Sequence, residues 1–377
     1  MKKILSAIII LTALTGISYA DIVYTTSDSL GLIRVDSVTS VDTPVLRYTN
    51  LGGDPLVGSY MARSEPYIMV VDRASNYSGG DTALIFKTSD LTSPEKSLYL
   101  KGVYDTKKFA SSYNGRSIFF ASRGNVSIVE FDTTSIDVPI NAYTYINDSE
   151  DQYEYEYEPE LIDMSVGSSY IYALFRTSSD SSDKVELFAF DGQLKEGVKN
   201  MKRGTIRNDA ANLSSLTSGR FAIGADEGIS IASHTSIRTL TSTDYPVKSI
   251  CSDTGDGLYF MEYSESGEVN LCHYHSSPKI IGVVDSMQGT SDCQLVKDSS
   301  YNVLAALTGD SIYLYDMTTD ELIASFDSSS LGGTPLNMTA SRAIYDDGSS
   351  SSSNCDVSCM GAITMIVLGV SLMRRKR

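Results

Sequence analysis

The sequence predicts an all-β fold made of repeated four-stranded units, and three observations support this. The 377 residues contain 24 Tyr and 28 Gly, and short apolar stretches are separated by segments rich in Ser, Thr and Asp. Within the stretches apolar and polar residues alternate, which is typical of strands with one buried face. The pattern returns about every 40 residues, a spacing that indicates the blades of a β-propeller.

Each repeat reads as an apolar strand, a short Gly, Asp or Asn turn, an alternating strand that ends in Asp, a Thr- and Ser-rich turn, and a last strand. The clearest copy is Cys293–Asp327, and Tyr113–Ile140 repeats it. One unit cannot bury its faces alone, so the units are expected to stack around a ring. Seven copies are predicted, with starts near Ile22, Leu56, Val103, Leu161, Leu213, Val247 and Cys293.

The two ends of the repeat region are expected to close the ring together. The first copy, which begins at Ile22, lacks its opening strand, and a strand-like remnant, Leu336–Tyr345, follows the seventh copy. This remnant would supply the innermost strand of the first blade, so few sheet edges would stay exposed. The fold class predicted is therefore a seven-bladed β-propeller over residues 21–346, closed by N- and C-terminal strands. The alternative is two β-sandwich domains, which would not give such regular spacing.

Residues 1–20 have the pattern of a secretory signal peptide. Two lysines precede the apolar stretch Ile4–Ile17, and the small-residue exit ends at Ala20. Cleavage is expected between Ala20 and Asp21, after a signal helix that is removed on export.

Residues 347–356 form a Ser-rich linker that contains Cys355, and residues 357–377 form an apolar segment with a basic end. The apolar part, Val357–Met373, has 17 residues, whereas a spanning helix usually needs about 20. Such a segment is expected to enter the bilayer as a hydrophobic helix with its basic end, Arg374–Arg377, on the cytoplasmic side.

This tail resembles the bacterial C-terminal sorting sequences of the Synergist type, which are related to the GlyGly and Myxo types. The resemblance rests on the spacer Ser349–Ser353, on Cys355, on the apolar stretch Met360–Met373 and on the basic end. It implies export and sorting machinery as partners, processing near Cys355 and display at the cell surface. Asn354–Cys359 departs from the usual pattern, which leaves the cut position, and a plain permanent membrane anchor, open.

Short stretches of the body resemble the bacterial YVTN-type propeller repeats. These are Asn125–Thr134 and Ser311–Asp316, and Ile22–Thr26 is similar to the naming motif with Thr26 where Asn is expected. The resemblance implies a propeller and carries little about function, because propellers host both binding and catalysis.

The formal net charge of −17 argues against nucleic acid as a partner. The run from Tyr153 to Glu158 alternates tyrosine and glutamate. As a strand it would place Tyr153, Tyr155 and Tyr157 on one face, a candidate surface for an unknown protein, peptide or glycan. The alternative is a solvated acidic insertion between blades.

Metal and disulfide chemistry have few candidates. His273 and His275 would face one side of a strand and could share a metal, but no third ligand is visible, so two surface histidines are the favoured interpretation. Asp-rich turns such as Asp253–Gly257 lack the spacing of an EF-hand loop. Cys251 and Cys293 occupy matching places in consecutive repeats and could pair, or could be small buried hydrophobes. No metal and no cofactor is predicted.

No catalytic residue is predicted, because the sequence has no G-x-S-x-G elbow, P-loop or dinucleotide-binding fingerprint. The main functional prediction is a non-enzymatic, surface-exposed binding or envelope-associated protein. The alternative is an exported Ca²⁺-dependent hydrolase or lyase of lactonase type, with a metal in the propeller channel.

Overall fold

The computed structural model of the chain describes nineteen segments, and every structural statement below concerns them. They are residues 20–37, 40–53, 55–62, 65–72, 81–100, 106–111, 117–122, 125–131, 139–144, 160–166, 170–176, 185–191, 201–206, 209–216, 220–232, 237–253, 257–276, 279–298 and 302–340.

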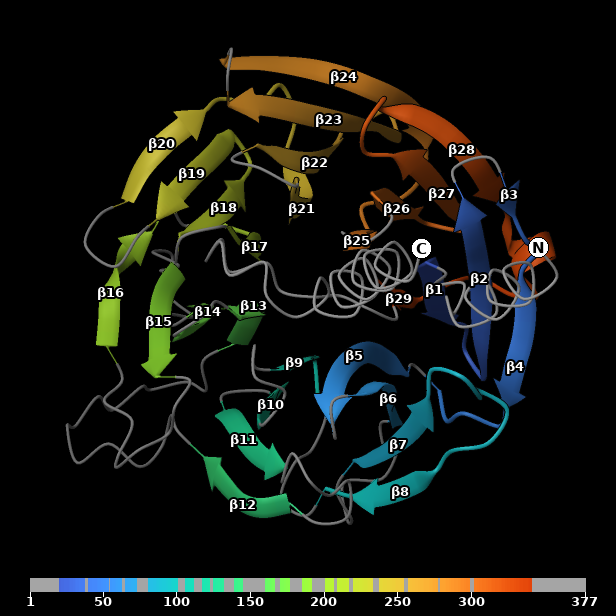
Figure 1. The fold of residues 1–377 in the computed structure, drawn as a ribbon. Helices are drawn as coiled ribbons and strands as arrows, with labels where there is room; N and C mark the ends of the chain where they lie inside the picture. Colours follow the sequence, from blue (N-terminus) through green and yellow to red (C-terminus); the bar gives the residue numbers. More distant parts are fainter. Residues whose placement is uncertain are drawn as a thin grey trace, which may run out of the picture.

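The described strands form seven antiparallel sheets, which we number 1 to 7 in chain order. Figure 1 shows the sheets arranged around a ring, with their strands ordered from the centre outwards. Together with the near absence of helix, this arrangement confirms the prediction of an all-β fold with the architecture of a β-propeller.

Sheet 1 contains β29 (Asn337–Ala340), β1 (Ala20–Thr25), β2 (Ser29–Ser37), β3 (Ser40–Val41) and β4 (Val45–Thr49). Sheet 2 contains β5 (Leu56–Ala62), β6 (Glu65–Asp72), β7 (Thr82–Lys87) and β8 (Lys96–Tyr99). Sheet 3 contains β9 (Lys108–Ser111), β10 (Ser117–Ser122), β11 (Asn125–Phe131) and β12 (Pro139–Thr144). Sheet 4 contains β13 (Glu160–Val166), β14 (Tyr170–Arg176), β15 (Val185–Asp191) and β16 (Met201–Ile206).

Sheet 5 contains β17 (Asn212–Ser215), β18 (Phe221–Ala225), β19 (Gly228–Ala232) and β20 (Ile237–Thr241). Sheet 6 contains β21 (Val247–Ser252), β22 (Leu258–Tyr263), β23 (Glu268–Ser276) and β24 (Lys279–Gln288). Sheet 7 contains β25 (Cys293–Asp298), β26 (Val303–Thr308), β27 (Ser311–Asp316) and β28 (Glu321–Phe326).

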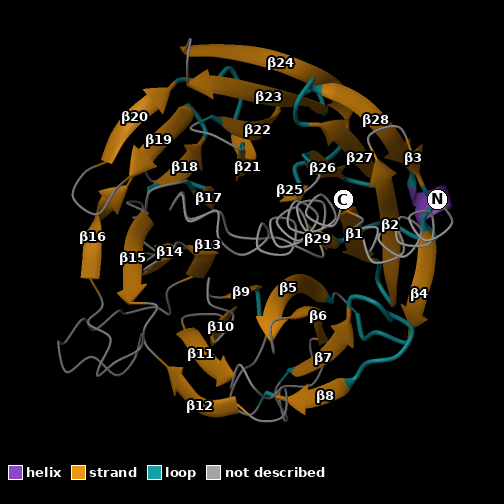
Figure 2. Ribbon diagram, viewed as in Figure 1, coloured by secondary structure: helices purple, strands orange, loops and turns teal. Residues whose placement is uncertain are grey.

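The chain ends meet in sheet 1, as the sequence predicts. β29 pairs with β1 in the register Ile22 to Ala340 through Thr25 to Asn337, so the last described strand is the innermost strand of the first sheet. A short helix, α2 (Ser328–Leu331), leads into β29 and is coloured purple in Figure 2. Its capping box between Asp327 and Ser330 satisfies amide groups that the first turn leaves free.

Burial in sheet 7 is greatest on the second strand and falls towards the outer edge. Every residue of β26 is buried, half of β27 is buried and no residue of β28 is buried, while the innermost strand, β25, has two buried residues. The apolar clusters lie between neighbouring sheets: one cluster joins sheets 6 and 7, and another joins sheets 7 and 1. Each sheet therefore needs its neighbours, as expected for stacked repeats.

Polar side chains of the innermost strands bridge to the main chain of the next sheet. Asp163 on β13 accepts from the Leu213 amide at 2.6 Å, and the Asn212 amide side chain donates to the Val247 carbonyl at 2.6 Å. The Ser249 hydroxyl accepts from the Leu295 amide at 3.0 Å. These bonds satisfy buried main-chain groups and tie consecutive sheets together around the ring.

One sequence prediction lies outside the described residues and another is wrong. The third copy is predicted to start near Val103, which is not among the described residues, and its first described strand begins at Lys108. The candidate disulfide between Cys251 and Cys293 is wrong, because the three described cysteines are free. Cys251 and Cys272 are buried in the apolar clusters, as the alternative interpretation expects.

Residues 1–19 and 341–377 lie outside the described residues, and with them the signal segment, the linker, Cys355 and the C-terminal hydrophobic segment. None of the helices in the described segments has the length and apolar character that crossing a membrane requires.

Candidate functional site: a histidine–aspartate cluster between two sheets

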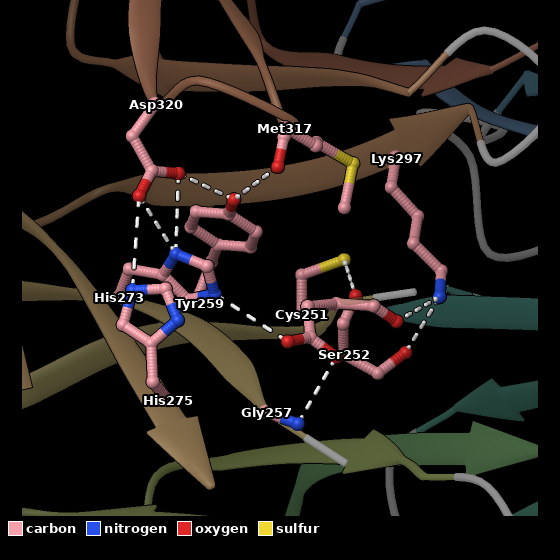
Figure 3. Close-up of polar contacts among 10 residues, drawn as sticks. Cys251, Ser252, Gly257, Tyr259, His273, His275, Lys297, Met317 and Asp320 are labelled. Carbon is pink, nitrogen blue, oxygen red and sulfur yellow. Dashed lines mark hydrogen bonds and ion pairs between the residues drawn. The ribbon is translucent and has the colours of Figure 1, made fainter. Parts of the chain in front are cut away.

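The two paired histidines of the sequence meet an aspartate from the next sheet. His273 and His275 lie near the end of β23 in sheet 6, and Asp320 lies in the turn between β27 and β28 of sheet 7. We call these three residues the His–Asp cluster. Figure 3 shows both imidazoles directed at the Asp320 carboxylate, with Tyr259 of β22 beside them.

The turn that carries Asp320 is organised by the aspartate that ends β27. The Asp316 side chain accepts from the Thr318 amide at 2.8 Å and from the Thr319 hydroxyl at 3.3 Å, and its carbonyl accepts from the Asp320 amide at 2.8 Å. Asp320 itself has φ of 60°, a left-handed conformation that Asp tolerates better than most residues. The Asp that ends this strand and the threonines after it therefore stabilise the turn. The turn places Asp320 against sheet 6.

His273 lies between two carboxylates. Its Nδ1 is 2.9 Å and 3.1 Å from the two carboxylate oxygens of Asp320, and its Nε2 is 3.4 Å from Oδ2 of Asp253. The ring stacks on Tyr259, with centroids 3.9 Å apart and planes 22° apart. His273 is only 5% exposed, so these contacts replace its solvent.

Each oxygen of the Asp320 carboxylate faces a second group besides Nδ1 of His273. The Tyr259 hydroxyl lies 2.6 Å from Oδ1, and it also lies 3.2 Å from the Met317 carbonyl. Oδ2 faces Nε2 of His275 at 3.9 Å. The His275 side chain is 47% exposed, so the cluster opens to solvent on that side.

Asp253, which supports His273, is itself fixed by main-chain contacts. Its Oδ1 accepts from the Gly257 amide at 3.0 Å, and its carbonyl accepts from the Lys297 ammonium at 2.9 Å. A side chain at Gly257 would collide with the Asp253 carboxylate and the Tyr274 carbonyl. Glycine is needed there because the two elements approach so closely.

The surroundings change the pKa values of the site. Burial, the largest single effect, would lower the pKa of His273, but the hydrogen bonds and charges of Asp253 and Asp320 together outweigh it and raise the pKa above 6.5. Burial first, and then the hydrogen bond to Asp320, raise the pKa of Tyr259. Burial raises the pKa of the nearby Cys251 thiol to about 11, so this cysteine is not a nucleophile at neutral pH.

The cluster has the composition of a metal-ligand set. One ligand atom from each of its three residues lies within 4.8 Å of the others, and in the described part of the chain it is the group of His, Cys, Asp and Glu found to meet this condition. Antiparallel strands alternate in direction, so the turn after β21, the end of β23 and the turn after β27 lie at one end of the sheets. The cluster is therefore between sheets at one face of the ring, whereas the sequence-based alternative expects a metal in the channel.

The sequence interpretation of two surface histidines is wrong for His273, which is buried, and fits His275, which is exposed. The missed residue is Asp320. The repeat register carried the signal, because His273 lies towards the end of the third strand of one copy and Asp320 lies in the turn that follows the third strand of the next copy.

Of the other candidate site residues, Ala20 and Asp21 belong to the described part of the chain. Tyr153, Tyr155, Tyr157 and Cys355 lie outside it. Ala20 and Asp21 begin β1, where Oδ1 of Asp21 is 3.1 Å from Nε of Arg34.

No protein-family profile and no curated protein matches the sequence. Solved structures do match its fold, over most of this chain and nearly all of theirs. A candidate 6-phosphogluconolactonase from Bacteroides fragilis superposes with a TM-score of 0.59 at 10% identity, over 86% of this chain and 99% of that chain. A candidate 6-phosphogluconolactonase from Bacteroides uniformis gives 0.57 at 13% identity, over 85% and 99%. The periplasmic gluconolactonase of Pseudomonas aeruginosa gives 0.58 at 12% identity, over 86% and 100%.

These similarities extend over nearly the whole of each compared structure, and at this identity they show the fold. They also correct the main functional prediction from the sequence, a non-enzymatic binding or envelope protein. The three compared structures are named as lactonases or candidate lactonases, the class of enzyme given in the sequence-based alternative.

Proposed function

We propose that the chain is an exported hydrolase of lactonase type, which opens a cyclic ester of a sugar acid with water. The observation that carries the proposal is the likeness, over 85–86% of this chain, to one gluconolactonase and two candidate 6-phosphogluconolactonases. The proposal replaces the Ca²⁺ channel site of the sequence-based alternative with the His–Asp cluster as candidate centre.

Opening a lactone requires that a water molecule be activated for attack on the carbonyl carbon. An imidazole, or an ion bound by imidazoles, can do this. The His–Asp cluster supplies two imidazoles, a carboxylate and an open side at His275. Asp253 and Tyr259 hold the buried part in one orientation, which is the preorganisation a catalytic site needs.

The test is hydrolysis of glucono-δ-lactone and of 6-phosphogluconolactone by the purified full chain, followed by acid release in a pH-stat. The proposal expects turnover above the spontaneous rate, and a loss of at least about 100-fold in kcat/KM for Asp320→Asn if the cluster is the centre. Asp310→Asn, in the turn between β26 and β27, is the matched control and should retain full activity.

Two results separate the parts of this proposal. Turnover that survives Asp320→Asn would move the hydrolytic centre away from the cluster and leave the function standing. No turnover of either lactone by the full chain would overturn the function.

The finer features of the fold and its destination are proposed with it. We infer seven blades for the whole chain, export with cleavage between Ala20 and Asp21, and sorting through the tail that contains Cys355. The support is the repeat count, the signal pattern and the resemblance of the tail to sorting sequences. An intact mass of the protein from its native envelope would test both processing positions, and a mass that retains residues 357–377 would contradict tail removal.

A further inference from the structure

We propose that the His–Asp cluster binds one divalent transition-metal ion of the zinc class, through His273, His275 and Asp320. This inference concerns binding and does not depend on lactone hydrolysis.

The spacing of the ligand atoms fits a tetrahedral ion. Zinc lies about 2.0–2.1 Å from nitrogen and oxygen ligands, and two such ligands at a tetrahedral angle are about 3.3 Å apart. In the cluster, Oδ2 of Asp320 is 2.9 Å from Nδ1 of His273 and 3.9 Å from Nε2 of His275. One distance would lengthen and the other shorten, each by about half an ångström, to reach the tetrahedral value.

The ring of His273 has the support that metal-binding histidines usually have. A ligating histidine commonly donates its other ring nitrogen to a carboxylate, which fixes its tautomer and orientation. Here Nε2 of His273 faces Asp253, while Nδ1 faces Asp320. Tyr259 fixes the orientation of the Asp320 carboxylate in a similar way. Its hydroxyl donates to Oδ1, and Oδ2 faces the histidines.

The kind of ion follows from the ligand atoms. Two imidazole nitrogens and one carboxylate oxygen suit Zn²⁺ and its neighbours in the first transition row, whereas Ca²⁺ and Mg²⁺ prefer sets made wholly of oxygen. Three protein ligands at a partly exposed position leave a fourth place for water. That is the coordination of catalytic rather than structural zinc sites.

The experiment is calorimetric titration of the chelator-treated full chain with ZnCl₂ at pH 7.5. We expect one ion per chain, with binding at least about 100-fold weaker in Asp320→Asn and about 10-fold weaker in the supporting variant Asp253→Asn. Asparagine suits the left-handed backbone of position 320, so this variant should keep the turn. Co²⁺ in place of Zn²⁺ should give the visible absorption of a tetrahedral ion.

Two variants control for adventitious binding by an acidic protein. His234→Gln removes the third histidine of the chain, which lies outside the described residues, and Asp310→Asn removes a carboxylate of the same sheet. Both should bind Zn²⁺ as the wild type does.

Folding is checked by thermal melts, in which Zn²⁺ should raise Tm of the wild type and leave that of Asp320→Asn unchanged. His273→Gln should lose Zn²⁺ binding. If that variant does not fold, His275→Gln, at the exposed position, replaces it and should also lose binding. Binding that survives both Asp320→Asn and His275→Gln, or no saturable binding at all, would overturn the proposal.

Discussion

At the scale of single residues, the environment of each polar side chain decides its role. Asp316 and Asp320 are four residues apart and belong to one turn, but the first forms turn hydrogen bonds and the second faces two imidazoles. His273 and His275 are likewise neighbours on one strand face, and only the first is enclosed by carboxylates. Residue type alone does not separate these cases, because packing between sheets supplies the difference.

Glu262 on β22 gives a prediction at this scale. It is 6% exposed, and burial, with repulsion from Asp244, raises its pKa to about 7 against a weaker opposing effect of the hydrogen bond from the Asp244 backbone. The unfolded chain loses this proton near pH 4.5. Between these two values the folded protein holds the proton more tightly, so the free energy of unfolding falls as pH rises, by up to about 3 kcal/mol.

Glu262→Gln should therefore stabilise the protein at pH 8 and change it little at pH 4. The charged neighbour Asp244 and the thiol of Cys272 face the same group and remain in both proteins. Urea unfolding followed by circular dichroism at the two pH values measures the difference. A stability difference that does not depend on pH would show that Glu262 is not the titrating group.

At the scale of elements, close contacts between strands depend on particular small residues. On the hairpin of β1 and β2, the ring of Tyr24 covers Gly31, and its hydroxyl donates to the Leu331 carbonyl at 2.9 Å. Tyr24 is fully buried, and burial raises its pKa to about 12. Tyr24 of β1 thus contacts both β2, at Gly31, and α2, at Leu331, and α2 leads into the closing strand β29.

Gly31→Ala should destabilise this hairpin, because the added methyl would overlap the Tyr24 ring. Overpacking of this kind costs about 1–3 kcal/mol. Gly282→Ala on the outer strand β24 is the matched control, since nothing lies within 4 Å of the position where its Cβ would be. Denaturant unfolding should separate the two variants, and equal stabilities would contradict the close contact at Gly31.

At the scale of the whole molecule, the ring closes through a strand from each end of the chain. The 40-residue period and the remnant at Leu336–Tyr345 were enough to predict this, because repeats and apolar alternation are written locally in the sequence. The His–Asp cluster was not predictable from ligand spacing, since Asp320 and His273 lie in different repeats and meet only after the sheets stack. The inter-sheet bridges of Asp163, Asn212 and Ser249 were missed for the same reason.

A substitution at Gln294 would test how the ring is closed. Its side-chain amide donates to the Met338 carbonyl at 3.0 Å, and its side-chain oxygen accepts from the Met338 amide at 2.8 Å, which joins β25 to β29. Gln294→Leu should lower the free energy of unfolding by about 1–3 kcal/mol, because both main-chain groups lose their partner.

Hydrogen exchange should then show that the β29 amides are the first to lose protection in Gln294→Leu. Gln288→Leu, an exposed position on β24, is the control and should leave β29 unchanged. Unaltered protection of β29 in Gln294→Leu would mean that other contacts hold the ring closed.

The most direct test of the His–Asp cluster as a metal-binding centre is anomalous diffraction at the zinc edge from crystals of the full chain grown with ZnCl₂. We predict one strong peak about 2.1 Å from the ring nitrogens of His273 and His275 and from the Asp320 carboxylate. A crystal whose zinc lies only elsewhere, or whose cluster carries no anomalous density at saturating ZnCl₂, would contradict it.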